Sequence, residues 1–244
     1  MEQQHFAVVF LVGRPAAGKS LVRSALSSVP LRERRGRFHL GEIASLDELS
    51  DLLDARQTDE LLAERGKPRL FTDRDGLLLD PALWDLFALK SNARALALLA
   101  RDPALFDQTT LLISLARGGL TGYGHALTLF ADELRQRAVV LGLRVSREEA
   151  QRRNRARAAG LDGPTPPALP EALLQYDFAI DQLATLPAAT RELPLEDGST
   201  LPCALLDVEQ EETDLHPERL RHSLSQACRD LWERRPEIAT EVEG

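Results

Sequence analysis

The strongest constraint on this chain is an apolar run near its amino end that leads directly into a loop bounded by glycines. Residues 6–12 are all apolar, which is the pattern of a central parallel strand covered on both faces. The next segment, Gly13-Arg-Pro-Ala-Ala-Gly-Lys-Ser20, matches the spacing G-x-x-x-x-G-K-[ST] at every position. Residues 21–29 are predicted to be helical. This order of elements indicates an α/β fold with the loop at the carboxyl end of a buried strand.

The residue types in this loop are those that phosphate binding requires. Gly13 and Gly18 let the backbone curl closely, so that amide hydrogens point inward at phosphate oxygens. Lys19 is expected to reach the β- and γ-phosphates, and Ser20 to offer its hydroxyl to Mg2+. ATP is favoured over GTP because the chain has no Asn-Lys-x-Asp sequence for reading guanine. The predicted nucleotide contacts are Gly13, Arg14, Pro15, Ala16, Ala17, Gly18, Lys19, Ser20 and Leu21.

Strands and helices alternate along the rest of the chain. Ser45 and Ser146 are expected helix caps, each followed three residues later by a glutamate, and Asp197-Gly198 is expected to turn a hairpin over residues 192–207. Strands are predicted at 38–43, Thr109–Leu115, 138–145 and 203–208, and helices at 45–65, 81–101, 122–137, 147–157, 171–186 and Pro217–Arg234. The alternation predicts a three-layer α/β fold with a mostly parallel sheet. We expect one domain over residues 1–235, with a lid at about 147–170 and a flexible tail at 236–244.

The Gly-x-Pro-x-x-Gly-Lys form of the loop resembles that of nucleoside monophosphate kinases and other small-molecule kinases of the P-loop NTPase superfamily. The resemblance is specific over residues 6–29 and only topological from there to about residue 232. It implies a five-stranded parallel core and an arginine-bearing lid. It also implies an acceptor site formed by the segments after the second and third strands.

The segment 146–157 is rich in arginine and follows the predicted fourth strand. Arg153 and Arg157 are four residues apart and therefore share one helix face. A guanidinium can grip two phosphate oxygens at once and stabilise the charge that spreads during phosphoryl transfer. The resemblance implies that these two arginines are catalytic residues of the lid. The alternative is a solvated basic helix, balanced by Glu148 and Glu149.

The acceptor side is less complete. Ser114 stands where a Walker B strand would end in an acidic residue, so another carboxylate must orient or deprotonate the acceptor. Asp47 is the first candidate for this catalytic role and Asp73 the second, as a substrate-binding residue. The alternative for Asp47 is an acid in the first helical turn, stabilised by the helix dipole. Arg117 partly matches the arginine that contacts the acceptor phosphate in nucleoside monophosphate kinases.

Together these features predict an ATP-dependent phosphotransferase that moves the γ-phosphoryl of Mg-ATP to a small-molecule or nucleotide acceptor. The alternative is a regulatory ATP-binding or NTPase switch with weak hydrolysis, which the serine at position 114 favours. The formal charge of -8 disfavours nucleic acid as a partner. Two scattered cysteines and short apolar runs predict a cytoplasmic protein with no membrane span. A homodimer is left open.

Overall fold

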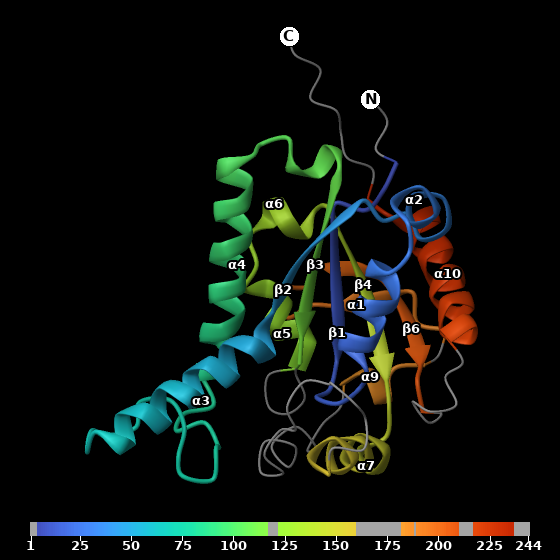
Figure 1. Ribbon diagram of the computed structural model, residues 1–244. Coiled ribbons are helices and arrows are strands. Elements are labelled where there is room, and N and C mark those ends of the chain that lie inside the picture. Colours follow the sequence, from blue (N-terminus) through green and yellow to red (C-terminus); the bar gives the residue numbers. More distant parts are fainter. Residues whose placement is uncertain (1–3, 117–121, 160–181, 188, 210–216, 237–244) are drawn as a thin grey trace.

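A computed structural model describes residues 4–116, 122–159, 182–187, 189–209 and 217–236 of the 244-residue chain. Its centre is a six-stranded sheet in the order β2-β3-β1-β4-β6-β5 (Figure 1). The strands are β1 (Val8–Gly13), β2 (Glu42–Asp47), β3 (Thr109–Leu115), β4 (Ala138–Arg144), β5 (Glu192–Pro194) and β6 (Thr200–Asp207). The first five in the order are parallel, as predicted, and β5 adds an antiparallel edge through the hairpin with β6. Gly198 turns that hairpin with a φ of 84°.

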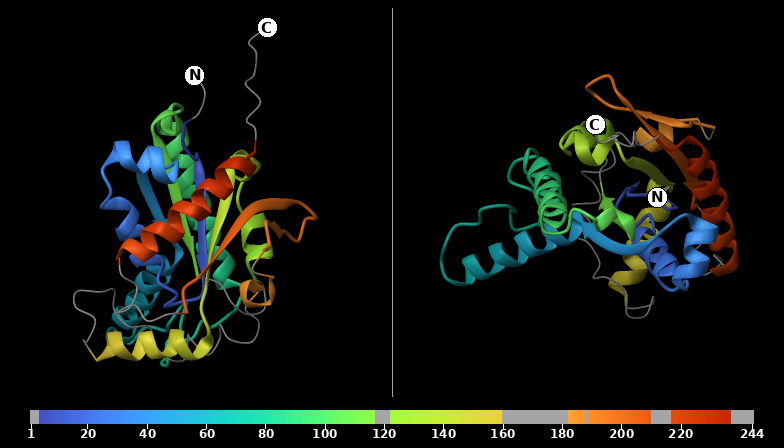
Figure 2. Two further views of the ribbon diagram at one scale, coloured as in Figure 1. Left: turned by 90° about the vertical axis from the view of Figure 1, so that its right-hand side faces the viewer. Right: turned by 90° about the horizontal axis from the view of Figure 1, so that it is seen from above.

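The sheet is covered on both faces, which makes three layers (Figures 1 and 2). Alternate residues of β1 point to opposite sides: Val9 and Leu11 pack on one face, and Val8, Phe10 and Val12 on the other. The first face is covered by α1 (Lys19–Ser27), α2 (Leu31–Phe38) and α10 (Pro217–Arg234). The second is covered by α4 (Leu83–Arg101), α5 (Gly122–Thr128), α6 (Asp132–Arg135) and α9 (Gln182–Thr185). Because every residue of β1 is buried, the central strand is held rigidly and can position the loop that follows it.

One helix leaves this layered core. α3 (Glu48–Glu64) runs outward from the end of β2, and residues 65–82 return from its tip to α4 (Figure 1). We call residues 48–82 the arm. A small apolar cluster of Leu52, Ala55, Leu78 and Phe87 holds its base against α4. Leu61 and Leu70, farther along the arm, are each 57% exposed.

Several predicted boundaries were wrong. The second strand begins at Glu42 rather than residue 38, because Leu31–Phe38 forms the unpredicted helix α2. Ser45 lies inside β2, and Asp47 caps α3 instead, since its side chain accepts from the N–H of Leu49 at 3.1 Å.

The helices on the second face also differ from the predictions. The segment at Asp80 forms a turn before α4 begins at Leu83, two residues later than expected. The helix predicted over 122–137 is divided into α5 and α6, and the amide of Ala131 between them donates to Asn92 Oδ1.

The predicted arginine-rich helix is confirmed as α7 (Arg147–Ala158), with Ser146 as its cap. Residues 160–170 of the predicted lid, most of the helix predicted over 171–186, and the tail 237–244 lie outside the described residues.

Candidate functional site

The glycine loop joins the central strand β1 to α1. β1 lies between β3 and β4, so the loop lies where successive connections diverge to the two sides of the sheet, the usual ligand position in such folds. Gly13 is confined: a Cβ there would lie 3.1 Å from both the carbonyl oxygen and the Cβ of Leu143, and 3.3 Å from the Cβ of Ala17. Gly18 has a φ of 97°, which favours glycine strongly. Close packing and the left-handed backbone therefore each explain one glycine of the motif.

The loop backbone alternates in handedness. Ala16 has a φ of 62° and Gly18 one of 97°, while Ala17 between them is not in the positive-φ region. Such alternation turns successive N–H groups towards one concavity, which is how backbone nests bind anions. α1 begins at Lys19 with no acidic residue in its first turn, so the positive end of its dipole faces the same region.

Lys19 lies across the loop. Its side chain is buried, and its ammonium donates to the carbonyl oxygens of Gly13 at 2.5 Å and Arg14 at 3.0 Å. A buried ammonium needs such partners to offset its lost hydration. These two hydrogen bonds hold the Lys19 ammonium next to the backbone of the glycine loop.

α7 brings a guanidinium to the same loop. Arg153 is only 1% exposed, and its Nη1 lies 3.9 Å from the place where a Cβ on Gly18 would be. Its Nε donates to Glu149 Oε1 at 2.7 Å and its Nη2 to the carbonyl of Val208. Arg157 follows one turn later on α7 and is half-buried. The structure thus places Arg153 beside the loop and fixes it from two directions.

The hydrogen bonds at the start of α7 leave the Glu149 carboxylate available to bind arginines. Ser146 Oγ accepts from the N–H of Glu149 at 3.2 Å, as expected, but the N–H of Ser146 donates to Glu209 Oε2 at 2.5 Å and not to Glu149. The Glu149 carboxylate instead binds Arg152 and Arg153. Hydrogen bonds from Arg152 first, and then from Arg153, hold the pKa of Glu149 below its usual value, so this carboxylate is an anion at neutral pH.

Asp47 ends β2 and caps α3 at the same edge of the sheet. Its Oδ2 accepts from Arg23 Nη1 of α1 at 3.2 Å, and its Oδ1 accepts from the N–H of Leu49. In the sheet it is paired with Ser114 of β3. Arg23 lies three residues after Ser20, on the same side of α1, so the ion pair draws Asp47 towards the first turn of α1. Asp47 therefore both caps a helix and lies near the loop.

The other two predicted acceptor residues fall elsewhere. Asp73 lies in the returning segment of the arm, where its Oδ1 accepts from the N–H groups of Asp75 and Leu77, each at 2.9 Å. Its carboxylate thus stabilises its own turn. Arg117 lies outside the described residues.

A carboxylate that the sequence analysis overlooked lies at the end of β3. Glu48 is 0% exposed, and its Oε2 accepts from the N–H of Ala116 at 3.1 Å. It joins the start of α3 to the residue that follows β3, close to where the missing acid of that strand would be. Its position directly after Asp47 at the start of a helix was the available signal. Over the described ranges, no three His, Cys, Asp or Glu side chains are grouped so as to hold a metal ion.

Comparisons with known proteins find similarity to solved structures only. No protein-family model matches the sequence, and no curated protein matches it either. Among solved structures, Chaetomium thermophilum Kti12 in complex with ADP-AlF3 is 16% identical over 93% of this chain and 97% of that chain, with a TM-score of 0.48. A sugar kinase from Janibacter sp. is 19% identical over 91% and 94% of the two chains, with a TM-score of 0.41. Shikimate kinase from Acinetobacter baumannii in complex with shikimate is 18% identical over 70% and 74%, with a TM-score of 0.35.

Within the part of the chain that the structure describes, none of the helices has both the length and the apolar character needed to cross a membrane. The sheet lies between two helical layers, and its central strand leads into the glycine loop. Five parallel strands in the order β2-β3-β1-β4-β6, with this loop after β1, give the chain a three-layer α/β fold with a mostly parallel sheet, as the sequence predicted.

Proposed function

We propose that this protein is an ATP-dependent phosphotransferase that acts on a small-molecule or nucleotide acceptor. One observation carries the proposal: at the carboxyl end of the central strand, the loop 13–20 forms a curl with alternating handedness, and Lys19 and Arg153 bring two positive charges to it. A polyphosphate is the ligand that needs backbone N–H donors, a helix amino end and cations at one place.

The residues present fit a nucleotide triphosphate. The N–H groups of Ala16 and Gly18 lie on the turned backbone, that of Ala17 donates to the carbonyl oxygen of Arg14 at 3.1 Å, and Lys19 is held beside them. Ser20 opens α1 and would offer its hydroxyl to Mg2+, which often keeps several waters and takes few protein ligands. Bound Mg2+ would neutralise charge on the phosphates. Leu21 is exposed just beyond, where it could contact the nucleotide.

Each charged residue has a distinct role in this proposal. Lys19 and Arg153 stabilise the negative charge on the transferred phosphoryl group, and Arg153 is effective because Glu149 and Val208 already hold its guanidinium in place. The oxygen of the acceptor hydroxyl forms a bond to the γ-phosphorus, and the bond from that phosphorus to the leaving oxygen of ADP breaks. Asp47 receives the proton that the acceptor hydroxyl loses. Arg157 and Arg117 remain predicted phosphate contacts.

A regulatory ATP-binding switch is the second candidate. The observation that favours it is the end of β3: Ser114 occupies the position of an acid, and the buried Glu48 nearby is bonded to the backbone of Ala116. A switch hydrolyses ATP slowly, and its rate responds to a protein partner. A phosphotransferase consumes ATP faster when its acceptor is added. The two candidates are therefore separated by which addition raises the rate.

The test follows ADP release from ATP with pools of sugars, hydroxy acids and nucleosides, using the wild-type protein, Lys19→Ala and Lys67→Ala. Lys67 is an exposed lysine of the arm and serves as the matched control. We expect one pool to raise the rate, Lys19→Ala to lower the stimulated rate by about 10²-fold or more, and Lys67→Ala to have no effect. Unchanged ATP affinity and turnover in Lys19→Ala would refute the site. Stimulation by a protein partner, with no response to any acceptor, would favour the switch.

A further inference from the structure

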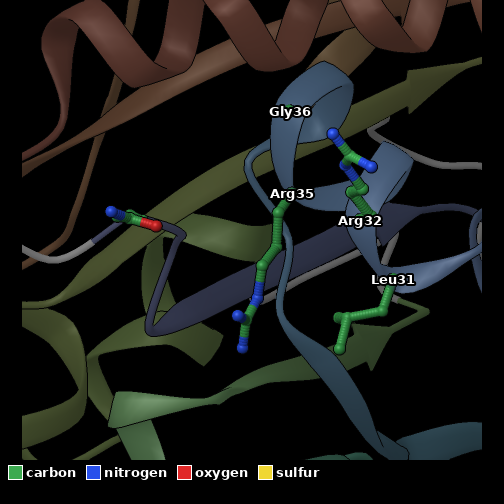
Figure 3. A pocket seen from close by; sticks show the side chains of 5 residues that line it. Leu31, Arg32, Arg35 and Gly36 are labelled. Carbon is green, nitrogen blue, oxygen red and sulfur yellow. The ribbon is translucent and has the colours of Figure 1, made fainter.

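A second basic hollow lies on α2, towards the end of the sheet opposite to the glycine loop (Figures 1 and 3). It has a volume of about 450 Å³, within the range of small-ligand sites. Its lining residues are Gln4, Leu31, Arg32, Arg35 and Gly36. The space beside Gly36 is empty, because a Cβ at that position would meet no atom within 4 Å. The hollow is thus formed by one helix and the start of the described chain.

The arginines of α2 divide into two kinds. Arg34 pairs with Glu42 at 3.2 Å, and Arg37 pairs with Glu33 at 3.4 Å. Arg32 and Arg35, which line the hollow, have no carboxylate partner among the described residues. Within the same residues, Arg35 Nη2 makes a long bond of 3.5 Å to Gln108 Oε1, while its buried Nε has no hydrogen-bond partner. The two arginines that face the hollow are therefore those whose charge is not neutralised by an acid.

Neighbouring arginines help to lower the pKa values of two histidines near α2, and one of these arginines, Arg35, lines the hollow. Burial lowers the pKa of His5 first, and the charge of Arg35 lowers it further. The opposite effects are smaller: a backbone hydrogen bond with Thr109 comes first and the charge of Asp107 next. Burial also lowers the pKa of His39, the residue after α2, and Arg235 and Arg229 of the α10 end add to that shift. In a chain with a formal charge of -8, Arg35, Arg229 and Arg235 thus bring positive charge to this region.

We propose that this hollow binds the phosphate group of a small molecule, at a site separate from the glycine loop. Arg32 and Arg35 are three residues apart on one helix. Their guanidinium groups point in different directions in Figure 3, so a phosphate in the hollow would draw both side chains towards it, a two-pronged contact that suits arginine better than lysine. Leu31 offers an apolar wall to the rest of the ligand, and Gln4 an amide. The size of the hollow and the overall negative charge favour a small ligand over a nucleic acid, which needs a wider basic surface.

The experiment measures pyrophosphate binding by calorimetry in a Lys19→Ala background, which weakens the glycine loop. Further substitution gives Arg32→Gln with Arg35→Gln, and, as a matched control, Arg37→Gln on the same helix. We expect a residual site in Lys19→Ala, an affinity at least about tenfold weaker in the double variant, and no change with Arg37→Gln. Thermal unfolding checks that each variant is folded, and Arg32→Lys with Arg35→Lys should recover part of the affinity.

Each contrary result is decisive. Residual binding that survives the double substitution would place the site elsewhere, and no residual binding at millimolar pyrophosphate would remove it. A short single-stranded oligonucleotide, titrated in parallel, distinguishes the source of the phosphate. If it binds far more tightly than pyrophosphate and loses affinity in the double variant, the ligand is a nucleic acid and the small-molecule assignment is wrong. Because this site does not use the glycine loop, failure here leaves the phosphotransferase proposal standing.

Discussion

The glycine loop and the returning segment of the arm organise backbone donors in opposite ways. In the arm, the buried Asp59 accepts from the N–H groups of Leu70, Phe71 and Thr72 and from the hydroxyl of Thr72. In the glycine loop, the N–H of Ala17 donates to the carbonyl oxygen of Arg14, and the left-handed residues Ala16 and Gly18 have no bond to a carboxylate among the described residues. The arm supplies its own anion, whereas the loop presents donors without one.

This difference shows why a carboxylate in a loop is weak evidence for chemistry. Asp73 and Asp59 both lie in or beside the returning segment, yet both are engaged by its backbone. The glycine loop instead places two cations, Lys19 and Arg153, beside donors that a ligand can use. A phosphate would occupy in the loop the role that Asp59 occupies in the arm. The following predictions test that contrast.

The largest effect should come from Asp59→Ala, because it removes a 0% exposed carboxylate that four donor groups share. Buried bonds to a charged acceptor contribute about 1.5–3 kcal/mol each and are not additive, so we expect a loss of about 3 kcal/mol in the free energy of unfolding. Urea denaturation measures it. Asp54→Ala, an exposed acid of the same helix, is the control and should change little. Because the arm supplies its own anion, ATP affinity per folded molecule should stay within about twofold; a larger loss would break the contrast.

The hydrogen bonds that the Asp59 carboxylate accepts also predict that stability depends on pH. Burial raises the pKa of Asp59, but hydrogen bonds from Leu70 and Thr72 outweigh it, and the folded-state pKa is lowered. A lowered pKa stabilises the fold above the unfolded value of about 4 and ceases to do so as the pH falls through the folded value. The stability gap between wild type and Asp59→Ala should therefore be full at pH 7 and shrink below about pH 4. If the difference in stability between the wild type and Asp59→Ala stayed constant on acidification, the stabilisation by Asp59 would not depend on the negative charge of its carboxylate.

The next effect compares two left-handed glycines, Gly18 of the loop with a φ of 97° and Gly66 of the arm with a φ of 67°. Gly18→Ala and Gly66→Ala should each lower stability by about 1–2 kcal/mol, because a side chain is strained in this region. Neither site is blocked sterically: Gly66 has open space, and Arg153 Nη1 is 3.9 Å from a Cβ on Gly18. Only Gly18→Ala should also weaken ATP affinity, by about tenfold, because it turns the loop donors away. Equal ATP affinity in the two variants would show that the loop geometry is not used for binding.

The elements that could be predicted are those whose signals are local. β3 and α10 begin and end where the sequence analysis expected them, because a continuous apolar run and an amphipathic segment define them without reference to the rest of the chain. α2 was missed because four of its eight residues are arginines and no apolar stripe marks it. Its end depends on distant contacts: His39 is left-handed, accepts from the N–H of Phe6 and stacks on Trp232.

The site divides in the same way. The loop 13–20 could be located because its spacing is a local requirement of phosphate binding. The bond of Arg153 to Val208 joins residues 55 apart, and that of Glu48 to Ala116 joins residues 68 apart. Neither distance is encoded in a local pattern. Asp47 was predicted as a site residue but not as the cap of α3. Its pairing with β3 extends β2 as far as Asp47 and so sets where α3 begins, and that pairing depends on the whole sheet rather than on the local sequence.

The smallest effect concerns the link that ties α4, where the arm returns, to the hairpin edge of the sheet. His125 of α5 lies 2.9 Å from Asp85 Oδ2 of α4 through Nε2 and 2.8 Å from Glu196 Oε2 of the β5–β6 turn through Nδ1. The hydrogen bond to Asp85 contributes most to raising the pKa of His125, against burial, with Glu196 adding to it. A raised pKa stabilises the fold below the unfolded value of about 6.5 and loses that contribution as the pH rises through the folded value. Because the group is partly exposed, His125→Gln should cost at most about 1 kcal/mol at pH 6 and much less at pH 9 in urea denaturation. His222→Gln, at an exposed histidine of α10, should show no such difference. An equal cost for His125→Gln at both pH values would mean that the charged bridge does not tie α4 to the hairpin.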